Sequence, residues 1–470
     1  MFEPPRWSPL SILPIAAGLA WLWCAASFGV VGFLFSVIPG CLLLSSGMAT
    51  LLFPGDARIP HFAALGGLLG VPLAFPAFFV AGFGTGAVLV LLSAVSFVAA
   101  GAISVHQDPH VEDVPAPEPS VSLASQVAVD DVLLATMHLS LPLPRRGEQR
   151  RIRDEVHEAL ELFRDSGWLE KPADYHPAPP PLESPLLIRR HSRGVAFEHL
   201  SFASGYEPRP EEPGRERWMA LERNHTAHAW VLRHQAPERP WLVCINGYQM
   251  GMPLVDLQAF RAARLHHKLG LNLVIPVLPL HGPRKCGRRS GDGFLAGDIL
   301  DTTHAEAQAM WDLRRLLSWI RGQGGTRIGV HGLSLGGYNA ALLACLEELE
   351  CAIPGIPLAD TTRALWRHGP ALHIRHAERT GLVHDAVCEV TSVVSPLVLE
   401  PKVPKPGRYI FGAVADRLVP ADHVRDLWRH WDRPRIVWYQ GGHVTFRLHR
   451  EAAGLLEEGL RETGFVASPT

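Results

Sequence analysis

Uncharged residues dominate the first hundred positions of the chain. The stretch from Ser8 to Gly55 contains no Asp, Glu, Lys, Arg or His, and the stretch from Phe62 to Val105 contains none either. A membrane-spanning helix needs about 20 apolar residues, so each stretch is long enough for two. The pattern predicts a transmembrane region over residues 1–105 with four spans, at 10–28, 32–53, 62–79 and 86–104. The turns are expected near Gly29 and around Gly82.

This region reads as integral to a membrane, because its apolar runs are too long for a signal peptide. A buried soluble helical bundle is the alternative. With four spans, the N-terminus, loop 54–61 and everything after Val105 lie on one side. The cations nearest the spans, Arg6 and Arg58, are on that side, which predicts a multi-pass protein with its large domain in the cytoplasm. Seven cysteines, an odd number without a paired pattern, agree with a reducing compartment.

Residues 106–190 are expected to be a linker and an N-terminal extension. The part from 106 to 129 is rich in Pro, Asp and Glu, which is typical of a linker. A fragment that starts near Val129 is therefore expected to be soluble and still to react with a fluorophosphonate probe. Residues 151–163 carry apolar side chains at helical spacing and predict a helix, and the proline-rich run 171–185 predicts extended chain.

Short apolar runs alternate with helical stretches from Val195 onward. The first two, 195–201 and 226–233, resemble an opening pair of strands. Alternation of apolar strands with helices predicts an α/β domain over 191–470, with a mostly parallel sheet covered on both faces. The insertion at 361–405 occupies a common cap position. The later strands are expected at 241–245, 273–278, 327–330, 352–356, 409–413 and 436–439, and the main helices at 254–269, 303–321, 336–349 and 421–431.

A serine between glycines follows one of these strands. Gly332-Leu333-Ser334-Leu335-Gly336 comes after strand 327–330 and opens a helix, which is the context that the nucleophile elbow requires. The alternative is an ordinary turn in which Ser334 caps the helix. Net charge is −2 at pH 7, so nothing global favours a nucleic-acid partner.

From about Val195 to the C-terminus the chain resembles the α/β-hydrolase superfamily, in its esterase and dienelactone-hydrolase-like branch. The resemblance implies a catalytic triad in the chain order Ser, acid, His, with Ser334 as nucleophile. Asp416 follows strand 409–413 and His443 follows strand 436–439, where the family has its acid and its general base. Asp360 and Asp422 are alternative acids, and His449 is an alternative base.

The resemblance also implies an oxyanion hole made of two backbone N–H groups. One belongs to Leu335. The other, by the family pattern, belongs to Tyr248 in the loop after strand 241–245, where Asn246 stands in place of the family's usual histidine.

The segment after strand 273–278 is a candidate for substrate binding. It contains His281 and the cations Arg284, Lys285, Arg288 and Arg289, and arginine pairs well with carboxylate or phosphate groups. The segment could instead be a solvated loop, one paired with Asp292 and Asp298, or a contact for anionic lipid headgroups.

These residues predict a membrane-anchored serine hydrolase that cleaves carboxylic esters, of lipids or of small molecules, through an acyl-enzyme. No cofactor or metal is implied. Acyl transfer to an alcohol by the same triad is the alternative reaction, and a non-catalytic membrane scaffold is the alternative class of protein.

Overall fold

The computed structural model describes residues 7–140, 144–236 and 238–467. Contacts divide the chain into two compact units. The first unit comprises Met1–Ser140, Ala413–Asp422 and Trp438–His449; the second comprises Leu141–Gly412, His423–Val437 and Arg450–Thr470. Two short segments from the C-terminal third therefore belong to the same unit as the N-terminal helices.

The N-terminal region is helical, and its turns fall where the glycines predict them. Gly29 has φ 62° and Gly82 has φ 87°, a backbone conformation that glycine adopts readily. Among the residues that the structure describes, three helical segments are long and apolar enough to cross a membrane: Pro9–Ser27, Gly29–Leu52 and Phe83–Gln107. The helices of this region are α1 (Ile12–Ser27), α2 (Gly29–Leu52), α3 (Ile59–Leu73), α4 (Phe75–Val80) and α5 (Phe83–Gln107).

The predicted span 62–79 is divided into two shorter helices, so its length differs from the prediction. Helix α3 ends at Leu73, and α4 starts at Phe75 with Pro76 in its first turn. A proline has no N–H to donate and its ring clashes with the carbonyl four residues earlier, so a continuous helix cannot pass through Pro76 without a break or a kink.

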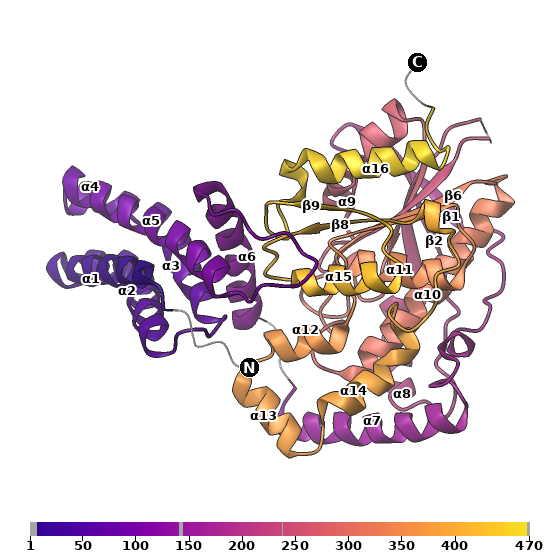
Figure 1. Cartoon of the computed structure of the whole chain (residues 1–470), viewed down its shortest axis with the longest axis horizontal. Helices are drawn as coiled ribbons and strands as arrows, with labels where there is room; N and C mark the ends of the chain where they lie inside the picture. The colour runs from indigo at the N-terminus through magenta and orange to yellow at the C-terminus, as the bar shows by residue number, and fades with distance from the viewer. Residues whose placement is uncertain (1–6, 141–143, 237, 468–470) are drawn as a thin grey trace. The chain divides into compact units, whose positions relative to one another are not determined.

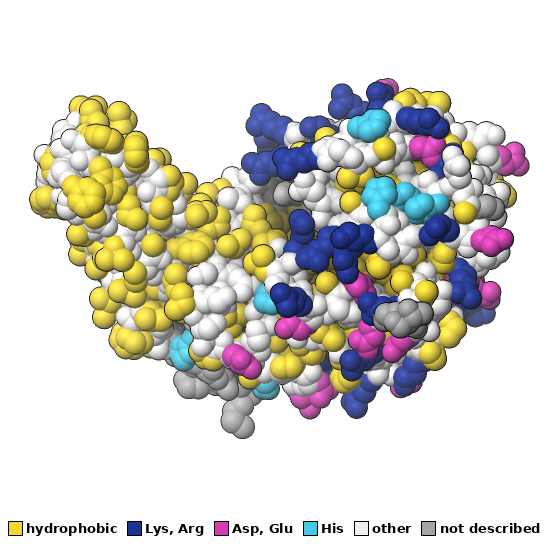
Figure 2. Space-filling view, turned by 90° about the horizontal axis from the view of Figure 1, so that it is seen from above, with side chains coloured by type: hydrophobic (Ala, Val, Ile, Leu, Met, Phe, Trp, Pro, Cys, Tyr) yellow, Lys and Arg dark blue, Asp and Glu magenta, His cyan; other side chains and the backbone are white. Residues whose placement is uncertain are grey.

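The surface of the N-terminal helices is apolar. Large side chains such as Val30, Phe79 and Phe83 are 76%, 77% and 78% exposed, and Figure 2 shows hydrophobic side chains over most of this region. Small residues allow some of the helices to approach closely: a Cβ on Gly18 would overlap the backbone of Leu44. Apolar outside and small residues between helices is the pattern of helices that pack in lipid.

Helix α6 (Val121–Ser140) corrects the predicted linker 106–129, whose last nine residues are helical. The hydroxyl of Ser120 accepts the N–H of Leu123 at 3.0 Å, as a helix cap does. Leu123 and Val127 then lie buried on one face. Helix α5 approaches closely, because a Cβ on Gly101 would overlap the carbonyl of Ala124. The helix was missed because the prolines before Ser120 obscure its start.

In the described part of the chain the sheet has nine strands, in the order β1-β2-β3-β5-β4-β6-β7-β8-β9. The pairs β1–β2, β2–β3 and β3–β5 are antiparallel, and β4–β5, β4–β6, β6–β7 and β7–β8 are parallel. The strands are β1 (Leu186–Ser192), β2 (Val195–Ala203), β3 (Thr226–Leu232), β4 (Trp241–Ile245), β5 (Asn272–Val277), β6 (Ile328–Leu333), β7 (Cys351–Gly355), β8 (Tyr409–Ala413) and β9 (Arg435–Tyr439).

Helices cover both faces of this sheet, which confirms the predicted α/β-hydrolase fold (Figure 1). Helices α9 (Pro253–Ala259) and α16 (Arg450–Glu462) lie on one face. Helices α10 (Ile299–Gly322), α11 (Leu335–Leu346) and α15 (Ala421–His430) lie on the other. Strand β1 was not predicted, and the expected domain boundary at 191 falls inside it. Most of its residues are exposed, so the strand has no apolar face for the pattern to reveal.

Helices also form the insertion at 361–405 and the extension before the sheet. The insertion folds into α12 (Thr361–His368), α13 (Ala371–Arg379) and α14 (His384–Thr391). The helix predicted at 151–163 is the middle of α7 (Arg146–Asp165), and α14 packs against it.

Candidate active site

Ser334 occupies a strained turn between β6 and α11. Strand β6 ends at Leu333, helix α11 begins at Leu335, and Ser334 between them has φ 59° and ψ −116°. Non-glycine residues rarely adopt this conformation, and they persist in it where the surroundings enforce it. The glycines explain how: a Cβ on Gly332 would overlap the carbonyl of Gly336, and one on Gly336 would overlap the carbonyl of Ile245.

The Ser334 side chain is not a helix cap. It makes no capping hydrogen bond to the described backbone of α11, which removes the main support for the alternative interpretation. Its neighbours on both sides, Leu333 and Leu335, are buried, whereas Ser334 itself keeps partial exposure. The turn therefore presents one hydroxyl at the N-terminus of a helix, where partial positive charge accumulates.

The loop after β4 lies against this turn. A Cβ built on Gly247 would lie 3.0 Å from the carbonyl oxygen of Leu333 and 3.5 Å from the Cβ of Ser334. Asn246, which replaces the expected histidine, braces the loop. In the amide orientation that satisfies both of its ends, Asn246 donates to the carbonyl of Pro276 at 2.8 Å and accepts the N–H of Gly251 at 3.2 Å. Asn246, whose side chain is held at both ends, therefore fixes the start of the loop that contains Tyr248.

Asp416 and His443 form a buried pair in the first unit. Nδ1 of His443 lies 2.6 Å from Oδ2 of Asp416, and the other carboxylate oxygen accepts the N–H of Val419 at 2.7 Å. The two residues are 3% and 5% exposed. Burial disfavours the imidazolium, but the charge and hydrogen bond of Asp416, together with the charge of Asp130, raise the pKa of His443 above its usual value. Because Nδ1 faces Asp416, Nε2 is the ring nitrogen turned away from that carboxylate.

Asp130 in helix α6 is a neighbour of this pair that the sequence did not predict. Its Oδ2 accepts the N–H of His443 at 2.6 Å and that of Arg417 at 3.3 Å, and its Oδ1 accepts the N–H of Val444 at 3.3 Å. The residue was missed because it follows the supposed linker. Two consecutive acids, Asp130 and Asp131, among apolar helical residues were the available signal. A fragment starting near Val129 would cut α6 just before both.

The alternative acids and base have other partners. Asp360 caps helix α12 by accepting the N–H of Arg363 at 2.8 Å. Asp422 lies in the first turn of α15. Nε2 of His449 lies 2.8 Å from the side-chain oxygen of Gln126, and its ring stacks on Tyr439.

The basic segment after β5 is divided between the interior and the surface. Arg284 is fully buried, with an ion pair to Asp312 at 2.9 Å and a hydrogen bond to the carbonyl of Asn224 at 2.9 Å. Its guanidinium is therefore paired inside the fold and is not at the surface. Arg288 and Arg289 are exposed, and the N–H of Arg289 donates to Asp292 at 2.8 Å.

His281 is also internal. It is fully buried, its Nδ1 lies 2.8 Å from the carbonyl of Pro279, and burial lowers its pKa to about 4. Its ring meets the ring of Tyr248 edge to face, with 5.9 Å between centroids. The neutral ring of His281 therefore packs against the ring of Tyr248.

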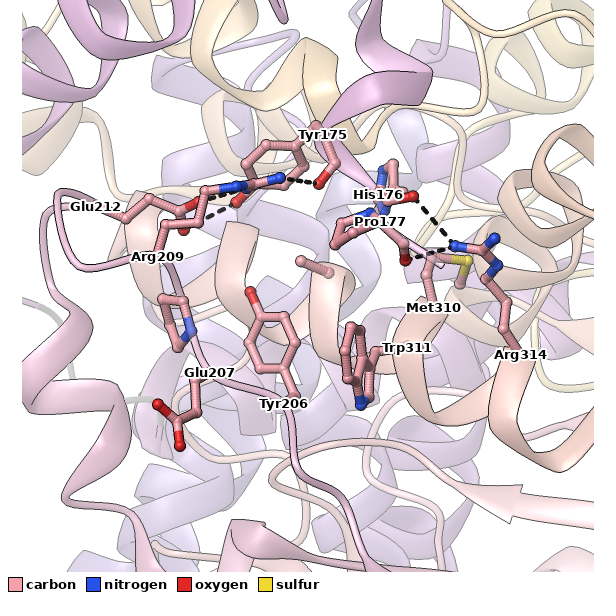
Figure 3. Close-up of a pocket in the computed structure, with 12 residues that line it drawn as sticks. Tyr175, His176, Pro177, Tyr206, Glu207, Arg209, Glu212, Met310, Trp311 and Arg314 are labelled. Atoms are coloured by element: carbon pink, nitrogen blue, oxygen red, sulfur yellow. Dashed lines mark hydrogen bonds and ion pairs between the residues drawn. The ribbon is translucent and has the colours of Figure 1, made fainter. Parts of the chain in front are cut away.

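A pocket in the second unit lies among residues outside the predicted site (Figure 3). Aromatic side chains of Tyr175, Tyr206 and Trp311 line it. The cations at its edge are already engaged: Arg209 pairs with Glu212 at 2.7 Å, and Arg314 donates to the carbonyl of Pro177 at 2.8 Å. Both cations are therefore paired with groups of the protein itself.

Comparison with known proteins finds close sequence relatives. The chain is 43% identical over 361 residues to the uncharacterized protein MT2702 of Mycobacterium tuberculosis (strain CDC 1551 / Oshkosh), which covers 76% of this chain and 86% of that protein. The uncharacterized protein Rv2627c of M. tuberculosis (strain ATCC 25618 / H37Rv) matches with the same identity and coverage. No protein-family model matches the chain.

Solved structures resemble the chain only distantly. An acylaminoacyl peptidase of Pyrococcus horikoshii is 14% identical, covers 61% of this chain and 42% of its own, and gives a TM-score of 0.36. A Thermogutta terrifontis esterase is 18% identical, with 52% and 92% coverage and a TM-score of 0.35. A putative hydrolase of Agrobacterium vitis S4 is 17% identical, with 60% and 98% coverage and a TM-score of 0.37. At such low sequence identities and TM-scores, these similarities give no information about the activity of the chain.

Proposed function

Since the chain belongs to the family of the uncharacterized mycobacterial protein MT2702, we propose a function from its own residues: it is a membrane-anchored serine hydrolase of carboxylic esters. The observation that carries the proposal is the backbone of Ser334, at φ 59° and ψ −116° between a strand and a helix. Strain of this kind is retained where it serves a purpose, and here it supports a nucleophile.

The proposed reaction proceeds in two halves. His443 Nε2 takes the proton of the Ser334 hydroxyl while Oγ attacks the ester carbonyl carbon. The C–O bond to the alcohol then breaks, and the alcohol leaves with the proton held by His443. Water, deprotonated by His443, attacks the acyl-enzyme, and the acid leaves as Ser334 recovers its proton. Asp416 holds the imidazole and stabilises its charged form.

The developing oxyanion would be bound by the backbone N–H groups of Leu335 and Tyr248. The contact between Gly247 and the elbow supports this assignment. The exposed arginines Arg288 and Arg289 are proposed to favour esters that carry an anionic group, whereas Arg284 and His281 are proposed to stiffen the wall behind the oxyanion loop.

The N-terminal helices are proposed to be integral to a membrane. Three segments have the required length, and α3 with α4 would form a fourth, kinked crossing that leaves the large domain on the N-terminal side. Of the cations that favour a cytoplasmic domain, Arg6 lies outside the described residues and Arg58 is paired with Asp56 at 2.8 Å. Resistance of the full chain to carbonate extraction tests insertion; release into the soluble fraction contradicts it.

A burst experiment tests the chemistry. With a chromogenic ester, the full chain in detergent should release about one equivalent of alcohol before steady turnover, because the acyl-enzyme accumulates. Ser334→Ala should abolish both burst and turnover. Adding an alcohol acceptor distinguishes hydrolysis from acyl transfer, since a transferase would convert the acyl group mainly to a new ester. If Ser334→Ala keeps both the burst and the steady turnover, the proposal is contradicted.

A further inference from the structure

A buried carboxylate in helix α6 accepts hydrogen bonds from the backbone of both segments that carry the acid–base pair. Asp130 is fully buried and accepts three backbone N–H groups, from His443, Val444 and Arg417. Two of these donors belong to the segment that carries the proposed base, and the third follows the proposed acid directly. Hydrogen bonds to a buried carboxylate are among the stronger ones in proteins, because the acceptor is charged and water is excluded.

The segment carrying His443 is shaped to approach this carboxylate. A Cβ on Gly442 would lie 2.6 Å from Oδ2 of Asp130, closer than side chains tolerate, so the approach depends on glycine at that position. One further contact holds the same segment: Nε2 of His449 lies 2.8 Å from the side-chain oxygen of Gln126, one helical turn before Asp130.

The segment carrying Asp416 is held by the next residue of the helix. Asp131 is fully buried and accepts the side chain of Arg417 at 3.2 Å and the hydroxyl of Ser104 in α5 at 2.6 Å. Arg417 also pairs with Asp108 and donates to the carbonyl of Ala57 at 3.0 Å. Helix α6 thus connects both segments to the N-terminal helices within one compact unit.

We propose that Asp130 is a positioning residue of this enzyme, which fixes the backbone of His443 relative to Asp416 and so makes helix α6 part of the catalytic apparatus. The inference rests on the proposed hydrolase function. It extends that function, because the acid–base pair would depend on a helix that lies outside the hydrolase domain predicted from the sequence.

The charge of Asp130 provides a readout that a purely structural contact would not. The ionisable groups that act on Asp130 are Asp416 and His443, and the phenol of Tyr439 is also nearby. Burial and the charge of Asp416 raise the pKa of Asp130 to about 7, so Asp130 carries its charge mainly above that pH, and where it is charged it raises the pKa of His443. Removing the charge therefore lowers the pKa of His443. Because the base must be neutral to act, the acid limb of the pH–rate profile should move to lower pH.

The test uses the full chain in detergent with Asp130→Asn, and with Asp165→Asn as the control that removes an exposed acid from helix α7. Asp130→Asn should lower kcat/KM by about 10²-fold, as small misplacements of catalytic groups do. It should also shift the acid limb to lower pH and speed hydrogen–deuterium exchange in peptides covering 440–447. Asp165→Asn should change none of these.

A second variant keeps the test decisive if Asp130→Asn does not fold. Gly442→Ala pushes the same contact from the opposite side and leaves the carboxylate in place. It should speed exchange in 440–447 and lower kcat/KM while the rest of the chain keeps its exchange pattern. If the wild type is active and both variants have its rate, pH profile and local exchange, the role of Asp130 is overturned and the proposed function is not. A wild type without ester turnover contradicts the proposed function instead, and the exchange data still decide whether Asp130 holds the segment.

Discussion

The elbow and the acid–base pair are built in contrasting ways, although the proposed reaction needs both. Ser334 is fixed by its immediate neighbours: a strand, a helix and two glycines impose its conformation. Asp416 and His443 lie on segments that are held by Asp130 and Asp131, through contacts between residues 286 and 313 positions apart in the chain. The conformation of the proposed nucleophile thus depends on residues close to it, whereas the proposed acid and base depend on contacts with helix α6.

The largest effect is expected from the acid. Asp416→Asn should lower kcat/KM by about 10⁴-fold, because an amide cannot hold the imidazole in the required tautomer. Asp360→Asn is the matched control and should have a much smaller effect, since Asp360 caps helix α12. Steady-state kinetics on both variants measures the contrast. A larger loss in Asp360→Asn would identify Asp360, in the segment after β7, as the acid instead of Asp416.

A smaller effect should follow from moving helix α6 without touching the pair. Gly101→Ala in α5 introduces a methyl group that overlaps the carbonyl of Ala124, so α6 must shift. We expect a loss of roughly 10-fold in kcat/KM and a lower melting temperature. Gly84→Ala is the matched control in the same helix, because nothing lies within 4 Å of its added methyl. Equal activity of the two variants would separate α6 from catalysis.

Stability should depend on pH through Asp131. Burial raises its pKa from the ordinary 3.8 to about 6, against the opposing effect of Arg417. Between these values the folded state binds more protons than the unfolded state, so the free energy of unfolding falls as pH rises through this window. Asp131→Asn cannot titrate and should show a shallower fall. Thermal melts from pH 4 to pH 6.5 measure this, and parallel curves for the two proteins would contradict it.

The smallest effect is expected at the exposed arginines. Arg288→Ala with Arg289→Ala should raise KM a few-fold for an anionic ester and leave a matched neutral ester unchanged, because exposed charges are largely screened. The pair Arg189→Ala with Arg190→Ala removes two exposed arginines from β1 and serves as the control. An equal change for both esters would remove the substrate role. A change confined to esters presented in anionic vesicles would favour headgroup contact.

The parts of the molecule that could be predicted from sequence are those whose signal is local. Strands β4 and β8 matched the prediction at both ends, since each is a short apolar run with clear limits. The glycines around Ser334 identified the elbow for the same reason. The acidic pair at 130 and 131 could have marked Asp130 as unusual, but its partners His443 and Arg417 could not be predicted, because only the fold brings them to it. Arg284 looked like a surface cation because its partner Asp312 lies in a different element.

Labelling of the full-length chain by a fluorophosphonate, with the modified peptide identified by mass spectrometry, tests directly whether Ser334 is an activated nucleophile. Such probes react with a serine only when a neighbouring base activates it. The account predicts modification of Ser334 alone in the wild type, no modification in Ser334→Ala, and strongly slowed labelling in Asp416→Asn. Labelling of another serine, or an unlabelled Ser334 in folded wild-type protein, would contradict it.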